Sequence, residues 1–443
     1  MSARASTALL TDRYELTMLD AALRDGTAHR RCVFEVFGRR LPGGRRFGVV
    51  AGTGRLLQLI EDFRFGDEEL RYLRDERVVD AATVRWLEDY SFRGTVTGYR
   101  EGELYFPGSP VLTVEGSFAE AVILETLALS VLNHDSAVAT AAARMSIAAG
   151  GRPLAEMGSR RTGERSAVAA ARAAHIAGFD ATSNLQAGSE WGIPTMGTAA
   201  HSWTLLHDSE EDAFRAQIVA LGTGTTLLID TYDIRTGVET AVRVAGTALG
   251  GVRIDSGDLP TVAAQVRRQL DDLGATSTRI TVTSDLDEFA LAALAASPVD
   301  AYGVGTSVVT GSGTPTAGMV YKLVARRDAA GAWVPVAKTS SAKGSRGGRK
   351  AAFRTLVNGV AAAELIAVSD GFDELDTVAE HPGSRPLQTT LIDEGRCDAT
   401  ALGAAGVAAA REHHARVRAE LPVAAHALSR SDPTLPTITV DAS

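Results

Sequence analysis

The sequence predicts an α/β protein in which a central (β/α) barrel is flanked by mixed α and β segments. Two observations support this class. In the middle of the chain, short apolar runs end in polar, glycine-rich turns and are followed by helical stretches at the spacing of βα units. The flanking segments show the period-2 alternation of antiparallel strands and a few amphipathic helices.

Composition excludes several classes. With 443 residues, 45% hydrophobic and 22% charged, the chain can bury a large core without disulfides. A formal net charge of −9 argues against a protein whose main task is binding nucleic acid. Cys32 and Cys397 are far apart in the sequence, which favours a reducing, cytoplasmic location. Residues 1–10 lack the core of a secretory leader, and charges interrupt the apolar stretch 119–149, so no transmembrane helix is expected.

The N-terminal segment predicts one helix and several strands. Residues 11–24 carry an apolar helical stripe that begins near a capping Thr11 or Asp12. Residues 31–39 alternate as a strand, and residues 93–114 alternate between turn signals as antiparallel strands.

The middle of the chain predicts about seven βα units, close to the number in a barrel. The clearest strands are 226–230, 251–255, 280–284 and 300–304. Weaker candidates are 153–157, 177–182 and 194–197. In such a barrel the ligand lies at the carboxyl ends of the strands, and the polar clusters of this sequence follow those ends.

The C-terminal segment returns to mixed character. Residues 338–354 are rich in glycine, serine and basic residues and predict either a solvated loop or a lid. Residues 400–421 predict an alanine-rich helix, and residues 434–443 a loose tail.

Two of the polar clusters carry basic or imidazole groups. Arg160 and Arg161 follow a predicted strand, where adjacent arginines bind phosphate or form a surface pair. Glycine and small residues precede His201, which suits a general base, a metal ligand, a phosphate-accepting nucleophile or a structural histidine.

Paired carboxylates end two consecutive strands, Asp230 with Asp233 and Asp255 with Asp258. Such pairs bind sugar hydroxyls, hold Mg²⁺ together with a diphosphate, or stabilise a cationic sugar. Alternatively, the second aspartate of each pair caps the following helix. Arg253 lies two residues before Asp255 on the same strand face and therefore needs an anion.

The late turn that contains Gly305, Thr306 and Thr310 has the composition of a phosphate cradle, with open N–H groups and hydroxyl donors. Together with the arginines and the aspartates, it predicts a site for a phosphorylated sugar with Mg²⁺.

These motifs, in this order, resemble those of the nicotinate phosphoribosyltransferase family over most of the chain. The resemblance rests on the segments 11–18, 34–42, 105–108, 158–161, 197–202, 230–233, 253–259, 303–306 and 320–323. It implies an irregular α/β barrel of the type II phosphoribosyltransferase kind, here 134–324. A second, smaller α+β domain would be built from 1–133 and 325–443.

The resemblance also implies the activity, an ATP-dependent reaction of the ligase or glycosyltransferase type. Nicotinate, phosphoribosyl diphosphate and ATP would give nicotinate mononucleotide, diphosphate, ADP and phosphate in NAD salvage. Mg²⁺ is the implied cofactor and ATP the co-substrate, and the family is typically a cytoplasmic homodimer.

The resemblance assigns a role to each matching residue. His201 would be phosphorylated by ATP, Thr198 and Arg253 would hold nicotinate, and Tyr14 would reach the pyridine ring from a neighbouring subunit. Arg160 and Arg161 would contact diphosphate. Asp255 and Asp258 would face the ribose and Mg²⁺, with the 5′-phosphate held among Gly305, Thr306 and Thr310.

Three alternatives differ in the substrate or in activity. A nicotinamide phosphoribosyltransferase is similar but has an aspartate at the position of Ala199, so an acid substrate fits this chain better. A quinolinate-using relative would need an extra basic motif for its second carboxylate. A catalytically inactive sensor of phosphoribosyl metabolites is disfavoured because every polar motif is intact.

Overall fold

The computed structural model describes residues 5–338, 346–369 and 383–441. By its contacts the chain divides into a composite unit, residues 1–140 with 314–443, and a sheet unit, residues 141–313. This division places a parallel α/β unit between two segments that fold together, which agrees with the predicted fold class. The composite unit holds more of the chain than the sheet unit, so the expectation that it would be the smaller one was wrong. The predicted bounds themselves, 1–133 with 325–443 against 134–324, already give the composite unit more residues.

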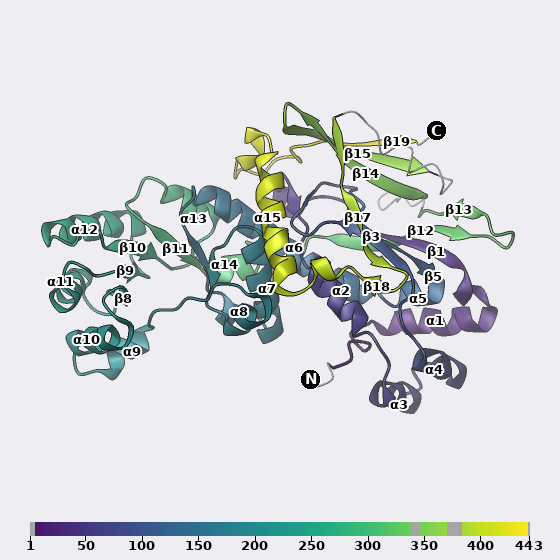
Figure 1. Ribbon diagram of the computed structural model, residues 1–443, viewed down its shortest axis with the longest axis horizontal. Helices are drawn as coiled ribbons and strands as arrows, with labels where there is room; N and C mark the ends of the chain where they lie inside the picture. The colour runs from purple at the N-terminus through teal and green to yellow at the C-terminus, as the bar shows by residue number, and fades with distance from the viewer. Residues whose placement is uncertain (1–4, 339–345, 370–382, 442–443) are drawn as a thin grey trace. The chain divides into compact units, whose positions relative to one another are not determined.

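An antiparallel seven-stranded sheet forms the centre of the composite unit, in the order β13-β12-β1-β5-β3-β17-β18 (Figure 1). Helices α1 to α5 come from the same N-terminal segment as three of these strands. The elements of residues 13–122 are α1 (Arg13–Asp25), β1 (Arg31–Gly38), β2 (Gly48–Val49), α2 (Thr53–Glu61), α3 (Asp67–Asp75), α4 (Ala81–Glu88), β3 (Thr95–Tyr99), β4 (Leu104–Tyr105), β5 (Leu112–Ser117) and α5 (Phe118–Val122).

The predicted N-terminal elements are confirmed. Asp12 is the extended residue before α1, and β1 pairs with β5 on one side and β12 on the other. Phe34 of β1 stacks on Tyr321 of β12 with ring centroids 4.9 Å apart, within the core cluster that also buries Leu16 and Leu19 of α1. β4 pairs with β2 in a separate two-stranded sheet.

The C-terminal segment contains two corrections to the predicted loop and tail. Its elements are β12 (Met319–Arg327), β13 (Trp333–Pro335), β14 (Arg349–Val357), β15 (Val360–Ser369), β16 (Ser384–Pro386), β17 (Gln388–Asp393), β18 (Arg396–Cys397), α15 (Gly403–Ala419) and β19 (Thr437–Asp441). The predicted loop 338–354 becomes strand β14 from Arg349 onward, where Lys350 pairs with buried Glu35 at 2.7 Å. Residues 339–345 of that loop lie outside the described residues. The predicted tail contains β19, which pairs in parallel with β15.

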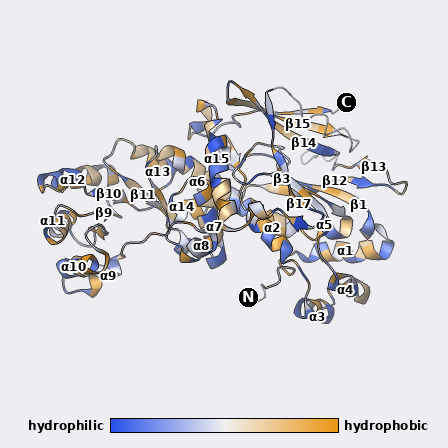
Figure 2. Cartoon of the chain, in the orientation of Figure 1, coloured by the Kyte–Doolittle hydropathy of each residue, from blue (hydrophilic) through white to orange (hydrophobic). Residues whose placement is uncertain are grey.

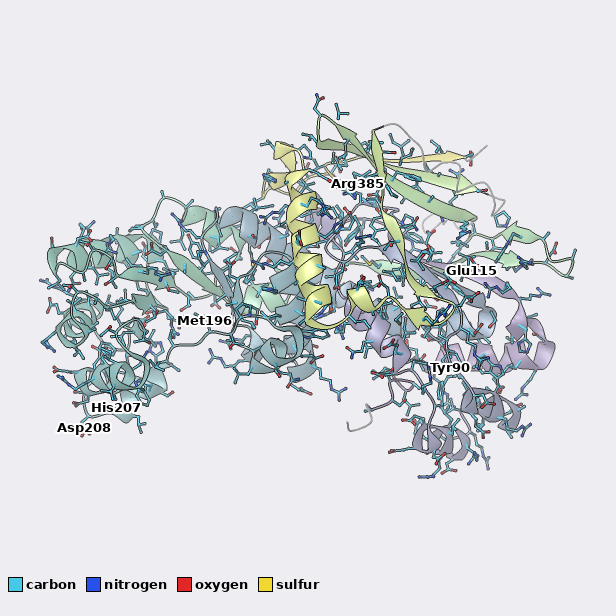
Figure 3. The ribbon with its side chains drawn as sticks, viewed as in Figure 1. Tyr90, Glu115, Met196, His207, Asp208 and Arg385 are labelled. Atoms are coloured by element: carbon cyan, nitrogen blue, oxygen red, sulfur yellow. The ribbon has the colours of Figure 1, made fainter. Side chains whose placement is uncertain are left out.

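An ionic cluster made of Glu103, Arg385, His413 and Glu420 ties α15 to the rest of this unit (Figure 3, Arg385). The Arg385 guanidinium lies 2.7 Å from carboxylate oxygens of both Glu103 and Glu420. Although burial raises the pKa of Glu103, hydrogen bonds from His413 and Arg385 lower it to about 2.

The chain enters the sheet unit inside the long helix α6 (Glu125–Ala148). The helical stretch 118–148 is long and apolar enough to span a membrane by length and composition, but 67% of its most apolar window is buried inside the molecule. Burial of this kind is typical of a core helix.

Six parallel strands, in the order β7-β6-β11-β10-β9-β8, form the sheet of the sheet unit. They are connected through helices, as the βα spacing predicts. The elements are β6 (Leu154–Glu156), α7 (Glu164–Ile176), β7 (Ala181–Thr182), α8 (Leu185–Trp191), α9 (His201–Leu206), α10 (Glu210–Leu221), β8 (Thr226–Leu228), α11 (Ile234–Ala245), β9 (Gly251–Ile254), α12 (Leu259–Asp272), β10 (Arg279–Val282), α13 (Glu288–Ala293), β11 (Ala301–Val304) and α14 (Thr306–Val309).

The seventh predicted strand, 194–197, is reduced to a single parallel bridge between Thr195 and Thr182. Pro194 lacks the N–H that a ladder strand needs, which explains why pairing stops there. The sheet is therefore an irregular half-barrel that begins at β7 and ends at β8.

Helices α10, α11 and α12 pack side by side along β8, β9 and β10 (Figure 1). Each carries both hydrophilic and hydrophobic residues, as Figure 2 shows, which suits helices with one face on a sheet. Side chains cap their first turns: Ser209 for α10, Asp233 for α11 and Asp258 for α12. The alternative interpretation of the second aspartate in each pair, helix capping, is thus confirmed.

Candidate active site

A cavity of about 490 Å³ lies at the carboxyl ends of strands β6, β9, β10 and β11. All its lining residues belong to the sheet unit. They are Met157, Arg160, Arg161, Thr198, Ala199, Ala200, Arg253, Asp255, Thr283, Ser284, Asp285, Gly303, Gly305 and Thr306. The structure therefore brings together seven of the predicted site residues, from four separate motifs.

Arg253 projects from β9 and is the central cation of the cavity. Its Nη1 donates a hydrogen bond of 2.6 Å to Thr198 Oγ1. Its Nε is buried and has no partner among the residues that the structure describes. Burial lowers the pKa of Arg253, and the Asp255 and Asp230 carboxylates oppose this effect. The arginine is thus held in place by a hydroxyl and keeps a buried donor for an anion.

Asp255 follows β9 and accepts a hydrogen bond from the Thr283 hydroxyl, which fixes one of its two oxygens. Behind it, Asp230 Oδ2 accepts from the Asp255 backbone N–H and from Ser256 Oγ, both at 2.8 Å. Asp230 Oδ1 is buried without a hydrogen-bond partner in the described part of the chain. Asp255 therefore lines the cavity, where a cation or a sugar hydroxyl would satisfy it, and Asp230 supports it from behind.

His201 begins α9, directly after the lining residue Ala200. Its Nδ1 lies 3.1 Å from Thr231 Oγ1, and its Nε2 lies 3.9 Å from Asp255 Oδ2. Because the side chain is 41% exposed, one ring nitrogen is oriented by the protein and the other is accessible.

Glu210 is a further carboxyl group near this region, at the start of α10. Burial, and then the charges of Asp233 and Asp230, raise the pKa of Glu210 to about 7. This side chain therefore changes charge close to neutral pH.

The two basic residues Arg160 and Arg161 lie in the 3₁₀ turn Ser159–Arg161 that follows β6. Gly158 opens this turn, and a Cβ atom at this residue would lie 2.8 Å from the carbonyl oxygen of Gly305 and 2.2 Å from Val309 Cγ1. The arginine turn and the Gly305 turn are therefore in direct contact, and only glycine fits between them.

Besides His201, three predicted site residues lie outside the cavity lining. Asp258 is exposed and its Oδ1 accepts from the Thr261 N–H at 3.0 Å, capping α12. Thr310 ends α14, and its hydroxyl donates to the Thr306 carbonyl at 2.8 Å. Tyr14 lies on α1 of the composite unit, where burial, and then the charge of Glu125, raise its pKa to about 12. Their functional roles stay predictions.

The segment Thr283-Ser284-Asp285 also lines the cavity and was not among the predicted site residues. It follows β10, and Ser284 has a positive φ of 146°, which is uncommon for a residue other than glycine. Strained backbone of this kind is found at functional sites. The signal was present in the sequence, because these polar residues end the strand that was identified at 280–284.

The carboxylates of the cavity fit a magnesium ion shared with a ligand. Among the described residues, no group of three or more His, Cys, Asp or Glu side chains is placed to hold a metal ion alone. Mg²⁺ usually takes one or two carboxylates and completes its shell with water and substrate phosphates. Asp255 and Asp285 line the cavity beside the arginines, so this donor set suits that mode of binding.

Comparisons with known proteins indicate one family. Residues 9–133 match the family described as the nicotinate phosphoribosyltransferase N-terminal domain, and residues 153–361 match the nicotinate phosphoribosyltransferase family. A nicotinate phosphoribosyltransferase of Mycobacterium tuberculosis is 55% identical over 98% of this chain and 95% of its own length. The human enzyme of the same name is 33% identical over 72% of each chain.

Two solved structures have the same fold. A crystal structure of human nicotinic acid phosphoribosyltransferase gives a TM-score of 0.82 at 28% identity, covering 97% of both chains. A nicotinate-nucleotide pyrophosphorylase from Pyrococcus furiosus gives a TM-score of 0.76 at 22% identity, covering 95% of this chain and 98% of its own. The second likeness concerns the fold alone.

Proposed function

Because this chain belongs to the nicotinate phosphoribosyltransferase family, we propose that its cavity joins nicotinate to the phosphoribosyl group of phosphoribosyl diphosphate. The products are nicotinate mononucleotide and diphosphate, and the reaction serves NAD salvage. The observation that carries the assignment to this cavity is the arrangement of Arg253, a basic turn and a carboxylate around one space.

Arg253 binds the nicotinate carboxylate in this proposal. A guanidinium forms paired hydrogen bonds with a carboxylate, and Arg253 has a buried Nε donor that no described residue satisfies. Thr198 holds the opposite side of the same guanidinium, which reduces the loss of side-chain freedom on binding.

Arg160 and Arg161 bind the diphosphate, and Gly305, Thr306 and the predicted Thr310 bind the 5′-phosphate. The contact between the arginine turn and the Gly305 turn places the two kinds of donor at neighbouring positions. Asp255 and Asp285 of the lining would hold Mg²⁺, and Asp258, which the sequence predicts as a ligand, would first have to release its cap of α12. When bound, the ion would neutralise part of the diphosphate charge.

The transfer requires charge stabilisation more than proton transfer. The ribose C1 becomes positive as its bond to diphosphate breaks, and the carboxylate of Asp255 favours that charge. The pyridine nitrogen of nicotinate attacks C1 with its own lone pair, so the reaction needs no general base.

ATP acts through His201 in this proposal. With Nδ1–H donating to Thr231 Oγ1, the lone pair of Nε2 is free to attack the γ-phosphorus of ATP. An N–P bond forms, the bond to ADP breaks, and water later releases phosphate from the histidine. The added negative charge would favour Mg²⁺, and through the ion it would favour the anionic phosphoribosyl donor.

We further place the enzyme in the cytoplasm as a homodimer, with Tyr14 of a neighbouring subunit on the pyridine ring. Nicotinamide is the disfavoured alternative substrate, because Ala199 lines the cavity where the related nicotinamide enzyme has an aspartate.

An assay of nicotinate and nicotinamide, each with and without ATP, tests the substrate assignment. We expect nicotinate to be used in preference and ATP to stimulate its use. The variant Ala199→Asp serves as a contrast to the unaltered chain. The added carboxylate would repel the carboxylate of nicotinate and raise the KM for nicotinate. Equal turnover of the two substrates by the unaltered chain would contradict the proposal.

A further inference from the structure

Glu156 is a buried carboxyl group beside the cavity, at the carboxyl end of β6, and is 1% exposed. It is not a lining residue, and the chemistry above gives it no role. Its Oε1 accepts a hydrogen bond from the backbone N–H of Gly158, and its Oε2 accepts from the Thr182 hydroxyl at 2.6 Å. One side chain thus joins the end of β7 to the turn that carries the two arginines.

The hydrogen bonds around Glu156 form a closed circuit. The Thr182 oxygen accepts from the Asn184 backbone N–H at 3.0 Å, so its own hydrogen is directed to Glu156. The Asn184 side-chain amide donates to Ser159 Oγ at 3.0 Å. The circuit therefore leaves the arginine turn at Gly158 and returns to it at Ser159, the residue before Arg160.

Glu156 satisfies donors and forms no ion pair within the part of the chain that the structure describes. Burial raises the pKa of this carboxyl, and hydrogen bonds from Thr182 and Gly158 oppose the rise. Burying a carboxylate without a cation is costly. Glu156 nevertheless lies between two segments of the site, where its hydrogen bonds to Gly158 and Thr182 hold the arginine turn against the end of β7.

We propose that Glu156 is a positioning residue for the phosphoribosyl donor: its carboxylate fixes the Gly158–Arg161 turn so that Arg160 and Arg161 meet the diphosphate together. The inference rests on the proposed contact of these arginines with diphosphate. It deepens that proposal by naming the group that aligns them without touching the substrate.

The variant Glu156→Gln tests the role with almost no change in volume. An amide offers one acceptor oxygen and one NH₂ donor. Its nitrogen must face either the Gly158 N–H, which can only donate, or the Thr182 hydroxyl, which must then turn its hydrogen away. We expect the KM for phosphoribosyl diphosphate to rise roughly ten-fold, with the KM for nicotinate and the melting temperature nearly unchanged.

Two further variants separate positioning from stability. Thr182→Val removes one donor of the circuit and should raise the same KM by a smaller factor. Glu364→Gln makes the same substitution at a carboxyl that is also buried, 0% exposed, in the composite unit. It should lower the melting temperature and leave the ratio of the two KM values unchanged. Inhibition by free diphosphate should weaken in Glu156→Gln and in Thr182→Val only.

A double-variant cycle decides the mechanism. In a background of Arg160→Ala with Arg161→Ala, the substitution Glu156→Gln should raise the KM for phosphoribosyl diphosphate no further. If the arginine background leaves this KM unchanged, the diphosphate contact is wrong and the role of Glu156 falls with it. If the arginines matter but Glu156→Gln has no effect, or multiplies with theirs, only the positioning role is overturned.

Discussion

Two arginines show how the sheet unit and the composite unit treat a half-buried cation differently. Arg385 of the ionic cluster pairs with both Glu103 and Glu420, and these carboxylates raise its pKa although burial lowers it. Arg253 donates to the hydroxyl of Thr198, and burial lowers its pKa overall. The protein supplies the anions for Arg385, whereas the Nε of Arg253 has no partner among the described residues. The two arginines therefore differ in the partner that the protein supplies, and the proposed binding role belongs to the one that lacks an anion.

The largest expected effect concerns the histidine of the binding site. His201→Ala should remove ATP-stimulated turnover completely while slow, ATP-independent transfer continues, because only the phosphate acceptor is lost. Initial rates with and without ATP measure this. Full ATP stimulation in the variant would exclude His201 as the acceptor.

Removing the structural arginine should reduce stability instead. Arg385→Met removes the guanidinium from Glu103, which is 1% exposed, and leaves His413 as the other side-chain partner of this carboxylate. Removing one partner from a buried ion pair costs about 3 kcal/mol or more. Chemical denaturation should show this loss at neutral pH. The contribution of Glu103 is present above the ordinary carboxyl pKa and is lost as pH falls toward about 2, so the gap between the two proteins should narrow in acid. Unchanged stability would remove the contrast with Arg253.

Removing the binding arginine should affect one substrate. Arg253→Ala should raise the KM for nicotinate roughly 100-fold, since a paired, charge-assisted contact is lost. The unfolding midpoint should change little, because Arg253 has a hydroxyl and not a carboxylate as its partner. Steady-state kinetics and thermal unfolding of the same preparation measure both quantities. An unchanged KM would exclude Arg253 from nicotinate binding.

The smallest expected effect is a change in pH dependence. Burial, and then the charges of Asp233 and Asp230, raise the pKa of Glu210 to about 7. Between the ordinary carboxyl pKa and this value, Glu210 is protonated in the folded protein and ionised in the unfolded chain. Its contribution to stability is therefore complete below the ordinary carboxyl pKa and lost as pH rises through about 7. Glu210→Gln should flatten the decline in stability across this range. A pH series of melting curves provides the measurement, and an identical decline would contradict the shift.

Much of the sheet unit was predictable because its strands and its polar turns alternate in the sequence. Arg160, Arg253 and Gly305 follow separate strands, and parallel strands bring their carboxyl ends to one edge. The sequence could not show which aspartate of a pair faces the cavity. Asp255 lines it and Asp258 caps a helix, a difference set by where the chain turns after β9.

The composite unit was less predictable because its contacts join distant segments. Nothing local in residues 437–441 indicates that they pair with β15, since a strand at a sheet edge depends on the partner that receives it. The ion pair between Lys350 and Glu35 likewise joins the C-terminal segment to the N-terminal segment. Glu156 illustrates a further limit, because a single buried acid has no sequence pattern to separate it from an exposed one.

The contact at Gly158 has a consequence for how such a site changes over time. A side chain there would collide with both Val309 and the Gly305 carbonyl, so neither of these two turns can be remodelled alone. Substitutions that enlarge one turn would need compensating changes in the other, and relatives with altered donors should show paired replacements at these positions. A redesign of the pocket would therefore have to change the two turns together.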